Sequence, residues 1–431
     1  MTPGVAHVVL PAIVAVSLVL MLVRPRGIAE VWWIGGGAAL LLALRLVPLK
    51  LAGKAVAEGS DVYLFLIGMM LLSELAKEQG VFEWVSSVAV RGAKGSCSWL
   101  FLLVYGVGTL VTIFMSNDAT AVVLTPAILS AVRKAKVQPL PYLFICALIA
   151  NAASFVLPIS NPANLVVFHT GMPPLGRWMA SFAVPSVLSI VATFCVMRLI
   201  FRKELCDAIE CEVDEVALTI EGKMVLGGLA VMIGVLLAAS AMKKDLGLPT
   251  CVAAVVIALV VSAKAKQNPA KLLKEVSWAT LALVAGLFIM VDAVESQGAL
   301  QLTQAWLHAG ESLGQAWGAM VVGFVVGIGN NLVNNLPLGL IAGGTLQAAG
   351  YSAQAAGVKS LLADAVLIGV DLGPNLSVTG SLATILWLIA LRKEKVEVSF
   401  WKFLKVGAIA MPVALIFALG GAIGMQMLLG K

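Results

Sequence analysis

Runs of about 20 apolar residues recur from one end of the chain to the other, and they constrain the fold more than any other feature. A helix rises about 1.5 Å per residue, so each run can cross a hydrocarbon core roughly 30 Å thick. The chain is 60% hydrophobic and only 12% charged, and this charged fraction is about half that of soluble proteins. We therefore predict an all-α polytopic protein with multiple passes through a membrane.

The first apolar run, residues 8–23, is predicted to be a retained helix. Its basic residues Arg24 and Arg26 follow the run, whereas a signal peptide carries them before it. The six cysteines include no C-x-x-C pair, so the sequence indicates neither a disulfide framework nor a metal site, and it contains no cofactor motif. The net charge of +6 is typical of basic loops at a membrane and gives no reason to expect nucleic acid as a partner.

The chain resembles itself at an offset of 218 residues, where IGMMLLSELAKEQG (67–80) aligns with AGLFIMVDAVESQG (285–298). Further matches at this offset, or one residue more, are Ser116-Asn117 with Asn334-Asn335 and 159–168 with 378–387. Weak internal symmetry of this kind is typical of transporter repeats. We predict a first repeat over 1–202, a cytoplasmic linker over 203–222 and a second repeat over 223–431.

The distribution of basic residues predicts that the two repeats have opposite orientations. Lys and Arg flank the segment 99–132 on both sides, but none occurs between Lys274 and Lys359, around the matching segment of the second half. Because basic loops collect on the cytoplasmic side, matching pieces should face opposite sides of the membrane. The expected architecture has about ten transmembrane helices, two re-entrant helical hairpins and two broken helices.

Four interruptions of the apolar pattern are expected to form the functional site. We place hairpin tips near 116–118 and 334–337 and helix breaks near 157–164 and 370–381, where Pro and Gly interrupt apolar stretches. Irregular backbone at membrane depth is tolerated only where protein or a water-filled cavity satisfies it. Broken helices also present unpaired N–H and C=O groups that bind substrates and ions.

Asp118, at the first predicted tip, is the leading candidate for chemistry. A carboxylate at membrane depth is energetically costly, and burial favours its protonated form, so it is a functional hypothesis by default. The structural alternative is an acid that caps the second helix of the hairpin. Leu336 occupies the matching position of the second half, so the fold does not require an acid there. We interpret Asp118 as a proton-coupling residue.

Asp371, beside Gly373-Pro374, is a second proton-coupling candidate, with capping of a half-helix as the equally weighted alternative. Neutral side chains at the tips and breaks suit a small uncharged polyhydroxyl solute or a sodium ion, although at least half are expected only to cap backbone. The absence of Lys and Arg there argues against a dicarboxylate or phosphate substrate. The candidate substrate-binding residues are Ser116, Asn117, Asn161, Asn164, Asn334, Asn335, Thr379 and Ser381.

Three segments resemble the bacterial arsenite and antimonite efflux permeases, the arsenical pump membrane proteins of the ion transporter superfamily. They are MSNDATAVVLTPAIL (115–129), NNLVNNLPLGL (330–340) and, most specifically, GVDLGPNLSVTGSLATILWL (369–388). The resemblance implies export of arsenite, as its neutral trihydroxide, and of antimonite in exchange for protons. It also implies a location in the cell inner membrane, as a homodimer embedded in lipid. The same resemblance implies optional coupling to a soluble arsenite-stimulated ATPase, with the chain as its membrane subunit.

The resemblance implies that the residues that match the family's motifs have functional roles; these are Asn117, Asp118, Asn335, Asp371, Thr379 and Ser381. One position departs from the expected pattern, because Asn375 stands where a Lys is expected after Gly-Pro. By analogy of fold we expect an elevator mechanism. The alternatives are a sodium/proton antiporter of the same superfamily and a channel, whereas an enzyme is not expected because no nucleophile-and-base pair is present.

Overall fold

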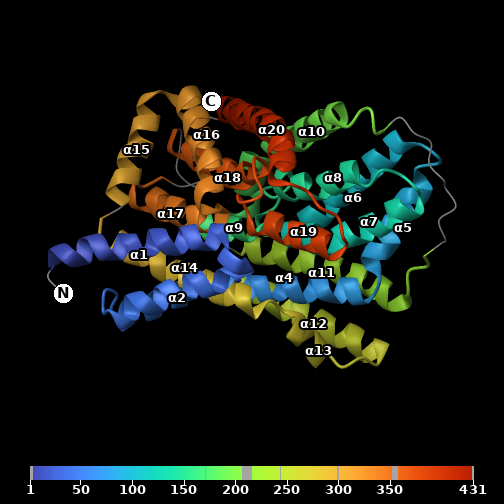
Figure 1. The fold of residues 1–431 in the computed structure, drawn as a ribbon, viewed down its shortest axis with the longest axis horizontal. Coiled ribbons are helices and arrows are strands. Elements are labelled where there is room, and N and C mark those ends of the chain that lie inside the picture. Colours follow the sequence, from blue (N-terminus) through green and yellow to red (C-terminus); the bar gives the residue numbers. More distant parts are fainter. Residues whose placement is uncertain are drawn as a thin grey trace.

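The computed structural model describes residues 3–169, 171–205, 216–242, 244–298, 300–351 and 358–429. Every element described is a helix (Figure 1). The helices of the first half are α1 (Pro3–Val23), α2 (Glu30–Ala43), α3 (Leu49–Glu58), α4 (Ser60–Glu78), α5 (Val81–Gly92), α6 (Cys97–Phe114), α7 (Thr125–Lys134), α8 (Leu140–Ala152), α9 (Pro162–Val167) and α10 (Leu175–Ile200).

The second half contains the same number of described α-helices. They are α11 (Ile220–Ala241), α12 (Gly247–Ala265), α13 (Ala270–Glu275), α14 (Trp278–Glu295), α15 (Leu300–Ser312), α16 (Gln315–Val333), α17 (Asn335–Ala348), α18 (Val358–Leu372), α19 (Leu382–Lys393) and α20 (Phe400–Leu429). Among the described residues, seven helices are long and apolar enough to cross a membrane, or up to eight if the bent pair α3–α4 is one span. The chain is therefore a multi-pass membrane protein.

The helices of the second half follow the order of the first at the offset seen in the sequence. Helices α4, α6 and α8 begin at 60, 97 and 140, and α14, α16 and α18 begin at 278, 315 and 358, each 218 residues later. Half of the predicted linker 203–222 lies outside the described residues, which omit 206–215.

The helices form two groups, and the helices of each group pack mainly against one another (Figure 1). In the first group α2 packs on α14 and α4 on α12, and we call α1–α4 and α11–α14 the frame. In the second group α10 packs along α20, α16 on α18 and α17 on α9, and we call α6–α10 and α16–α20 the site unit. The frame meets the site unit mainly through α4 and α14.

The predicted interruptions coincide with breaks in the observed helices. Helix α6 ends before Ser116, and a π-helical turn, Ala119–Leu124, leads into α7; we call this assembly hairpin 1. Helices α16 and α17 form hairpin 2 and meet at Asn334, whose φ of 75° lies in the left-handed region that Asn tolerates. Pro126 lacks an N–H and crowds the preceding turn, which accounts for the wider π-helical turn before it.

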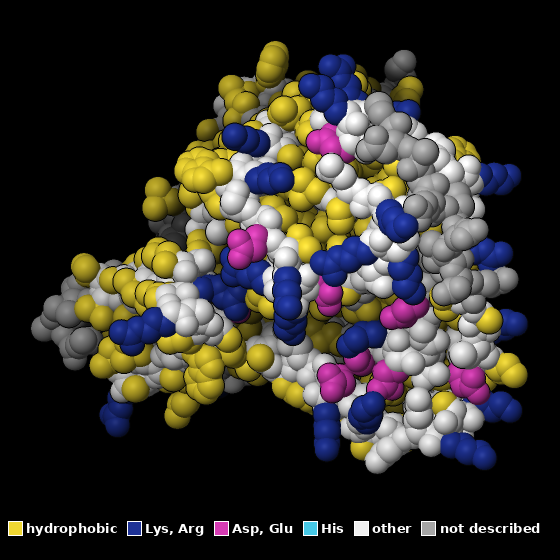
Figure 2. Space-filling model, turned by 45° about the vertical axis from the view of Figure 1, so that its right-hand side comes forward, with side chains coloured by type: hydrophobic (Ala, Val, Ile, Leu, Met, Phe, Trp, Pro, Cys, Tyr) yellow, Lys and Arg dark blue, Asp and Glu magenta, His cyan; other side chains and the backbone are white. Residues whose placement is uncertain are grey.

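The broken helices follow each hairpin. Helix α8 gives way to a 3₁₀ turn, Pro158–Ser160, before α9, and α18 gives way to a 3₁₀ turn, Gly373–Asn375, before α19. The molecule also has a basic end, at which α4, α5, α7, α12 and α19 terminate with Lys or Arg in their last turns. Figure 2 turns this end forward and shows Lys and Arg side chains spread over it, with acidic side chains among them.

Candidate functional site

A small central cavity of about 20 Å³ lies where the two hairpin tips meet both broken helices and the frame. Asn117 and Asp118 come from the tip of hairpin 1, Asn335 from the tip of hairpin 2 and Asn161 from the break between α8 and α9. The frame contributes Leu66 and Thr280, and the remaining lining residues are Pro162, Leu336, Leu382 and Ala383. Four of the predicted site residues are therefore brought together from segments up to 218 residues apart.

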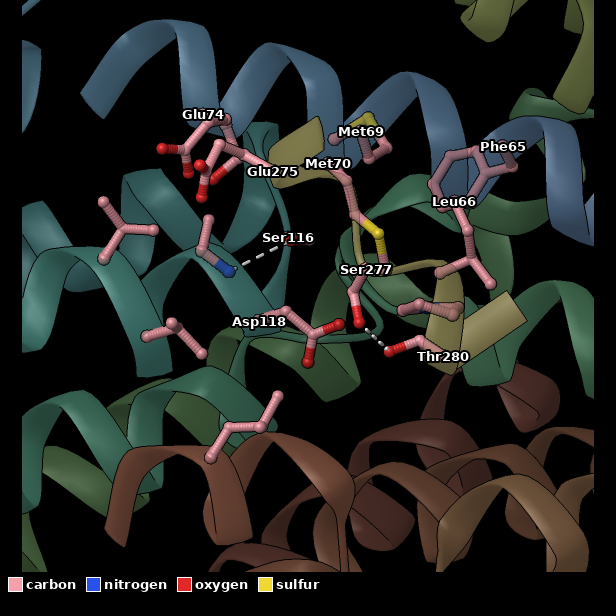
Figure 3. Close-up of a pocket in the computed structure, with 16 residues that line it drawn as sticks. Phe65, Leu66, Met69, Met70, Glu74, Ser116, Asp118, Glu275, Ser277 and Thr280 are labelled. Atoms are coloured by element: carbon pink, nitrogen blue, oxygen red, sulfur yellow. Dashed lines mark hydrogen bonds between the residues drawn. The ribbon is translucent and has the colours of Figure 1, made fainter. Parts of the chain in front are cut away.

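A larger cavity of about 140 Å³ continues from the central one toward the basic end. Asp118 lines both cavities and projects into the larger one from the tip of hairpin 1, facing Ser277 and Thr280 of the frame (Figure 3). Glu74 and Glu275 lie at the other end of this cavity, where Glu74 pairs with Lys77 at 2.7 Å. The larger cavity thus extends from two acids near the charged end of the molecule to Asp118, between mostly apolar side chains.

The side-chain oxygens of Asn117 and Asn335 are buried and have no hydrogen-bond partner among the described residues. Both line the central cavity beside Asp118, one from each hairpin. The amide oxygens of Asn151, Asn164 and Asn330 also lack partners but line none of the cavities described here. A buried acceptor without a partner is unfavourable, so the central cavity is suited to a ligand that donates hydrogen bonds or is positively charged.

Asp371 lies at the end of α18, completely buried, and is linked to the other broken helix. Its Oδ1 accepts a hydrogen bond of 2.7 Å from Nδ2 of Asn161, while no hydrogen bond to its Oδ2 is found within the described part of the chain. Asn161 also accepts from the backbone N–H of Ala163 at 3.0 Å and so caps α9. One side chain thus connects a helix terminus, the central cavity and a buried acid.

The other predicted site residues satisfy backbone at the interruptions. Nδ2 of Asn164 donates to the carbonyls of Ser154, Leu157 and Pro158, at 2.9, 3.3 and 3.3 Å. Ser381 caps α19 by accepting from Thr384 N–H at 3.1 Å, and this side chain lines none of the described cavities. In both residues the side chain satisfies backbone groups at a helix break.

Thr379, Asn334 and Ser116 also contact backbone. Thr379 donates to the carbonyl of Asn331 at 3.0 Å, and Asn334 donates to the carbonyl of Thr379 at 3.2 Å. Ser116 accepts from the N–H of Ala119 at 3.2 Å and lines the larger cavity. Of these three residues, only Ser116 adjoins Asp118 in a cavity described so far.

Asn375, which replaces the expected Lys, is fully buried and joins the two broken helices. It accepts from Asn151 at 2.9 Å and donates to the carbonyl of Leu148 at 3.0 Å. A neutral amide can fill both roles, whereas a Lys ammonium could only donate. The position therefore serves as a tie between α8 and the segment that follows α18.

Sequence reasoning missed the contribution of the frame to the cavities. Glu275, Ser277 and Thr280 precede or begin α14, and Ser277 and Thr280 share a hydrogen bond of 2.8 Å between their hydroxyls. In sequence these residues only mark the start of an apolar helix. No group of three or more His, Cys, Asp or Glu residues suited to a metal ion occurs in the described part of the chain.

Comparison with known proteins places this architecture among transporters. Residues 8–369 match the family described as "Citrate transporter". The chain is 27% identical to the "Arsenical pump membrane protein" of Escherichia coli strain K12, over 96% of this chain and 98% of that protein. The protein of that name from Yersinia enterocolitica is 26% identical, again over 96% and 98%. The resemblance to arsenical pump membrane proteins is thus confirmed over nearly the whole chain.

A solved structure shares the fold. The YdaH transporter of Alcanivorax borkumensis, whose crystal structure is described as having an unusual topology, superimposes with a TM-score of 0.57 over 90% of this chain and 89% of that chain, at 16% identity. At such low identity the likeness concerns the fold alone. Sequence, helix content and fold agree, and the chain belongs to the citrate transporter family as a multi-pass membrane transport protein.

Proposed function

We propose that this protein exports arsenite, as the neutral trihydroxide, and antimonite from the cytoplasm in exchange for protons. The observation that carries the proposal is the pair of unpartnered amide oxygens, from Asn117 and Asn335, beside Asp118 in the central cavity. A trihydroxide offers three O–H donors to these acceptors. The names of the relatives, arsenical pump membrane proteins, point to the same solute.

The same chemistry disfavours citrate, despite the description of the family. Citrate carries carboxylates, which require donors or cations, and no Lys or Arg is among the described residues that line either cavity. Asp118 would repel such an anion when ionised. The site therefore supports an uncharged donor more strongly than a carboxylate.

Proton coupling follows from competition at Asp118. The ionised carboxylate accepts hydrogen bonds from a solute hydroxyl, and a proton that binds Asp118 removes acceptor capacity and favours release. Asp371, hydrogen-bonded to the cavity residue Asn161, is a second candidate for a coupled proton. Solute and proton then occupy the site alternately, which is the requirement for exchange.

An elevator movement of the site unit against the frame would carry the site across the membrane. The more extensive packing within each group of helices than between them supports this motion. If the basic end is cytoplasmic, the cavity of about 140 Å³ faces the cytoplasm, as expected of an exporter ready to load. The boundaries at 1–202, 203–222 and 223–431 are part of this proposal.

The test is arsenite uptake into everted membrane vesicles energised by an imposed proton gradient. We expect saturable, proton-driven accumulation that Asp118→Asn abolishes while the protein remains in the membrane. Two parallel assays replace the proton gradient by a sodium gradient, and arsenite by labelled citrate. Proton flux on addition of sodium, without arsenite movement, would instead identify a sodium/proton antiporter. Citrate uptake would overturn the substrate assignment.

A further inference from the structure

A partly buried ion pair in the frame has no role in the site described so far. Arg24 and Glu30 flank the turn between α1 and α2, and an Arg24 guanidinium nitrogen lies 3.2 Å from Oε2 of Glu30. Glu30 is 8% exposed, and its other oxygen, Oε1, has no hydrogen-bond partner among the described residues. The arrangement leaves one carboxylate oxygen held in place and available as an acceptor.

Glu30 lines a third cavity, of about 10 Å³, against the tip of hairpin 2. Asn334, Leu336 and Pro337 form the hairpin wall, and α1, α14 and α19 supply the rest, namely Met21, Leu22, Leu283, Leu287, Leu382 and Ile385. Glu30 and Asn334 are the polar side chains of a lining that is otherwise apolar. The space fits roughly one hydroxyl-sized group.

The three cavities form a series along the boundary between the frame and the site unit. The cavity of about 140 Å³ shares Leu66, Asp118, Pro162 and Thr280 with the central cavity. The central cavity in turn shares Leu336 and Leu382 with the cavity at Glu30. Leu336 is also the repeat counterpart of Asp118. The tip of hairpin 2 therefore lies between two acids, Asp118 on hairpin 1 and Glu30 on the frame.

We propose that Glu30, oriented by Arg24, is a binding contact for the transported trihydroxide on the frame. As the site unit moves past the frame, an O–H group of the solute donates to Oε1 of Glu30. Arg24 holds Oε2 of Glu30, so Oε1 is the oxygen left to accept a hydrogen bond from the solute. This inference rests on the proposed function, and it adds a contact that does not travel with the site unit.

The test compares the KM for arsenite in the proton-driven vesicle assay between wild type and Glu30→Gln. Loss of a charge-assisted hydrogen bond should raise KM about 10-fold. Glu58→Gln is the matched control, because Glu58 is also an ion-paired glutamate of the frame, 3.3 Å from Lys54, but lines none of the three cavities. We expect its KM to equal that of wild type.

A charge swap separates binding from a structural role. The double variant Arg24→Glu with Glu30→Arg restores an ion pair, so it should recover protein level and thermal stability while KM stays raised. Recovery of the wild-type KM by the swap, or an unchanged KM in Glu30→Gln, would overturn the role of Glu30 and leave arsenite export intact. Absence of arsenite transport by the wild type itself would overturn both.

Discussion

At the scale of single residues, the asparagines at the interruptions divide into two kinds. Asn117 and Asn335 present unpartnered oxygens to the central cavity, whereas the Asn164 amide donates to three backbone carbonyls. Both kinds look alike in sequence, because an amide near a Pro serves equally as a ligand or as a cap. Contacts alone distinguish them.

Alanine substitution of a cavity asparagine should therefore change transport, whereas substitution of a capping asparagine should change stability. Asn117→Ala is expected to raise the KM for arsenite about 10-fold with an unchanged thermal midpoint, since it removes an acceptor without breaking a bond within the protein. Asn164→Ala is expected to lower the free energy of unfolding by about 1–3 kcal/mol, because it leaves buried carbonyls unpaired. Vesicle transport and thermal unfolding in detergent check both. Equal loss of stability in the two variants would contradict the division.

The buried acid Asp371 allows a separate residue-scale prediction. In Asp371→Asn the new amide oxygen still accepts from Asn161, so folding should be retained, but the side chain no longer binds and releases a proton. If Asp371 takes part in coupling, arsenite-dependent proton flux, measured with a pH-sensitive dye in vesicles, should fall at least about 10-fold. Unchanged flux would show that Asp371 only ties the two broken helices together.

At the scale of elements, α20 packs closely against the second helix break and holds it in place. A Cβ on Gly407 of α20 would lie 2.3 Å from the carbonyl oxygen of Asn375 and 2.4 Å from that of Leu376. Backbone atoms cannot move aside as a flexible side chain can, so only glycine fits at this crossing. The packing of α20 thus fixes the segment that joins α18 to α19.

Gly407→Ala should accordingly be destabilising, by about 1–3 kcal/mol, because the added methyl group forces α20 away from the break. Gly420→Ala is the control in the same helix, since a Cβ there meets no atom within 4 Å. Thermal unfolding of the detergent-purified variants measures the difference. Similar midpoints for both would show that the crossing is looser than the contacts indicate.

The positions of the breaks could be predicted from sequence because Pro, Gly and Asn interrupt otherwise apolar runs at matching places in the two halves. The frame residues beside Asp118 could not be predicted from sequence. Thr280 and Leu66 reach the cavity only because α14 and α4 pack against the hairpins, and one apolar helix looks like another in sequence. Glu30 was missed for the same reason, since its partner and cavity depend on tertiary contacts.

At the scale of the whole molecule, the division into frame and site unit predicts which crosslinks stop transport. Met70 on the frame and Val123 on hairpin 1 line the same cavity. In a cysteine-free variant, bridging Met70→Cys and Val123→Cys with a bifunctional maleimide should reduce transport to background, because it would fix the site unit to the frame.

A crosslink inside the frame provides the control. Gln79 and Gln267 are joined by a side-chain hydrogen bond of 2.9 Å between the ends of α4 and α12. Bridging Gln79→Cys and Gln267→Cys should leave arsenite uptake near the level of the uncrosslinked protein. Full activity with the first bridge in place would exclude movement of the two groups as the transport step.

The difference between Asp118 and Leu336, at equivalent positions of the two halves, has an energetic consequence. If the two halves were identical throughout, the two opposite-facing states of the carrier would have equal energy, and an idle protein would divide its time equally between them. An ionisable group on one tip alone lifts this degeneracy. If Asp118 binds and releases a proton as proposed, the balance between the two orientations depends on pH, whereas the direction of net flux is set by the gradients of proton and solute.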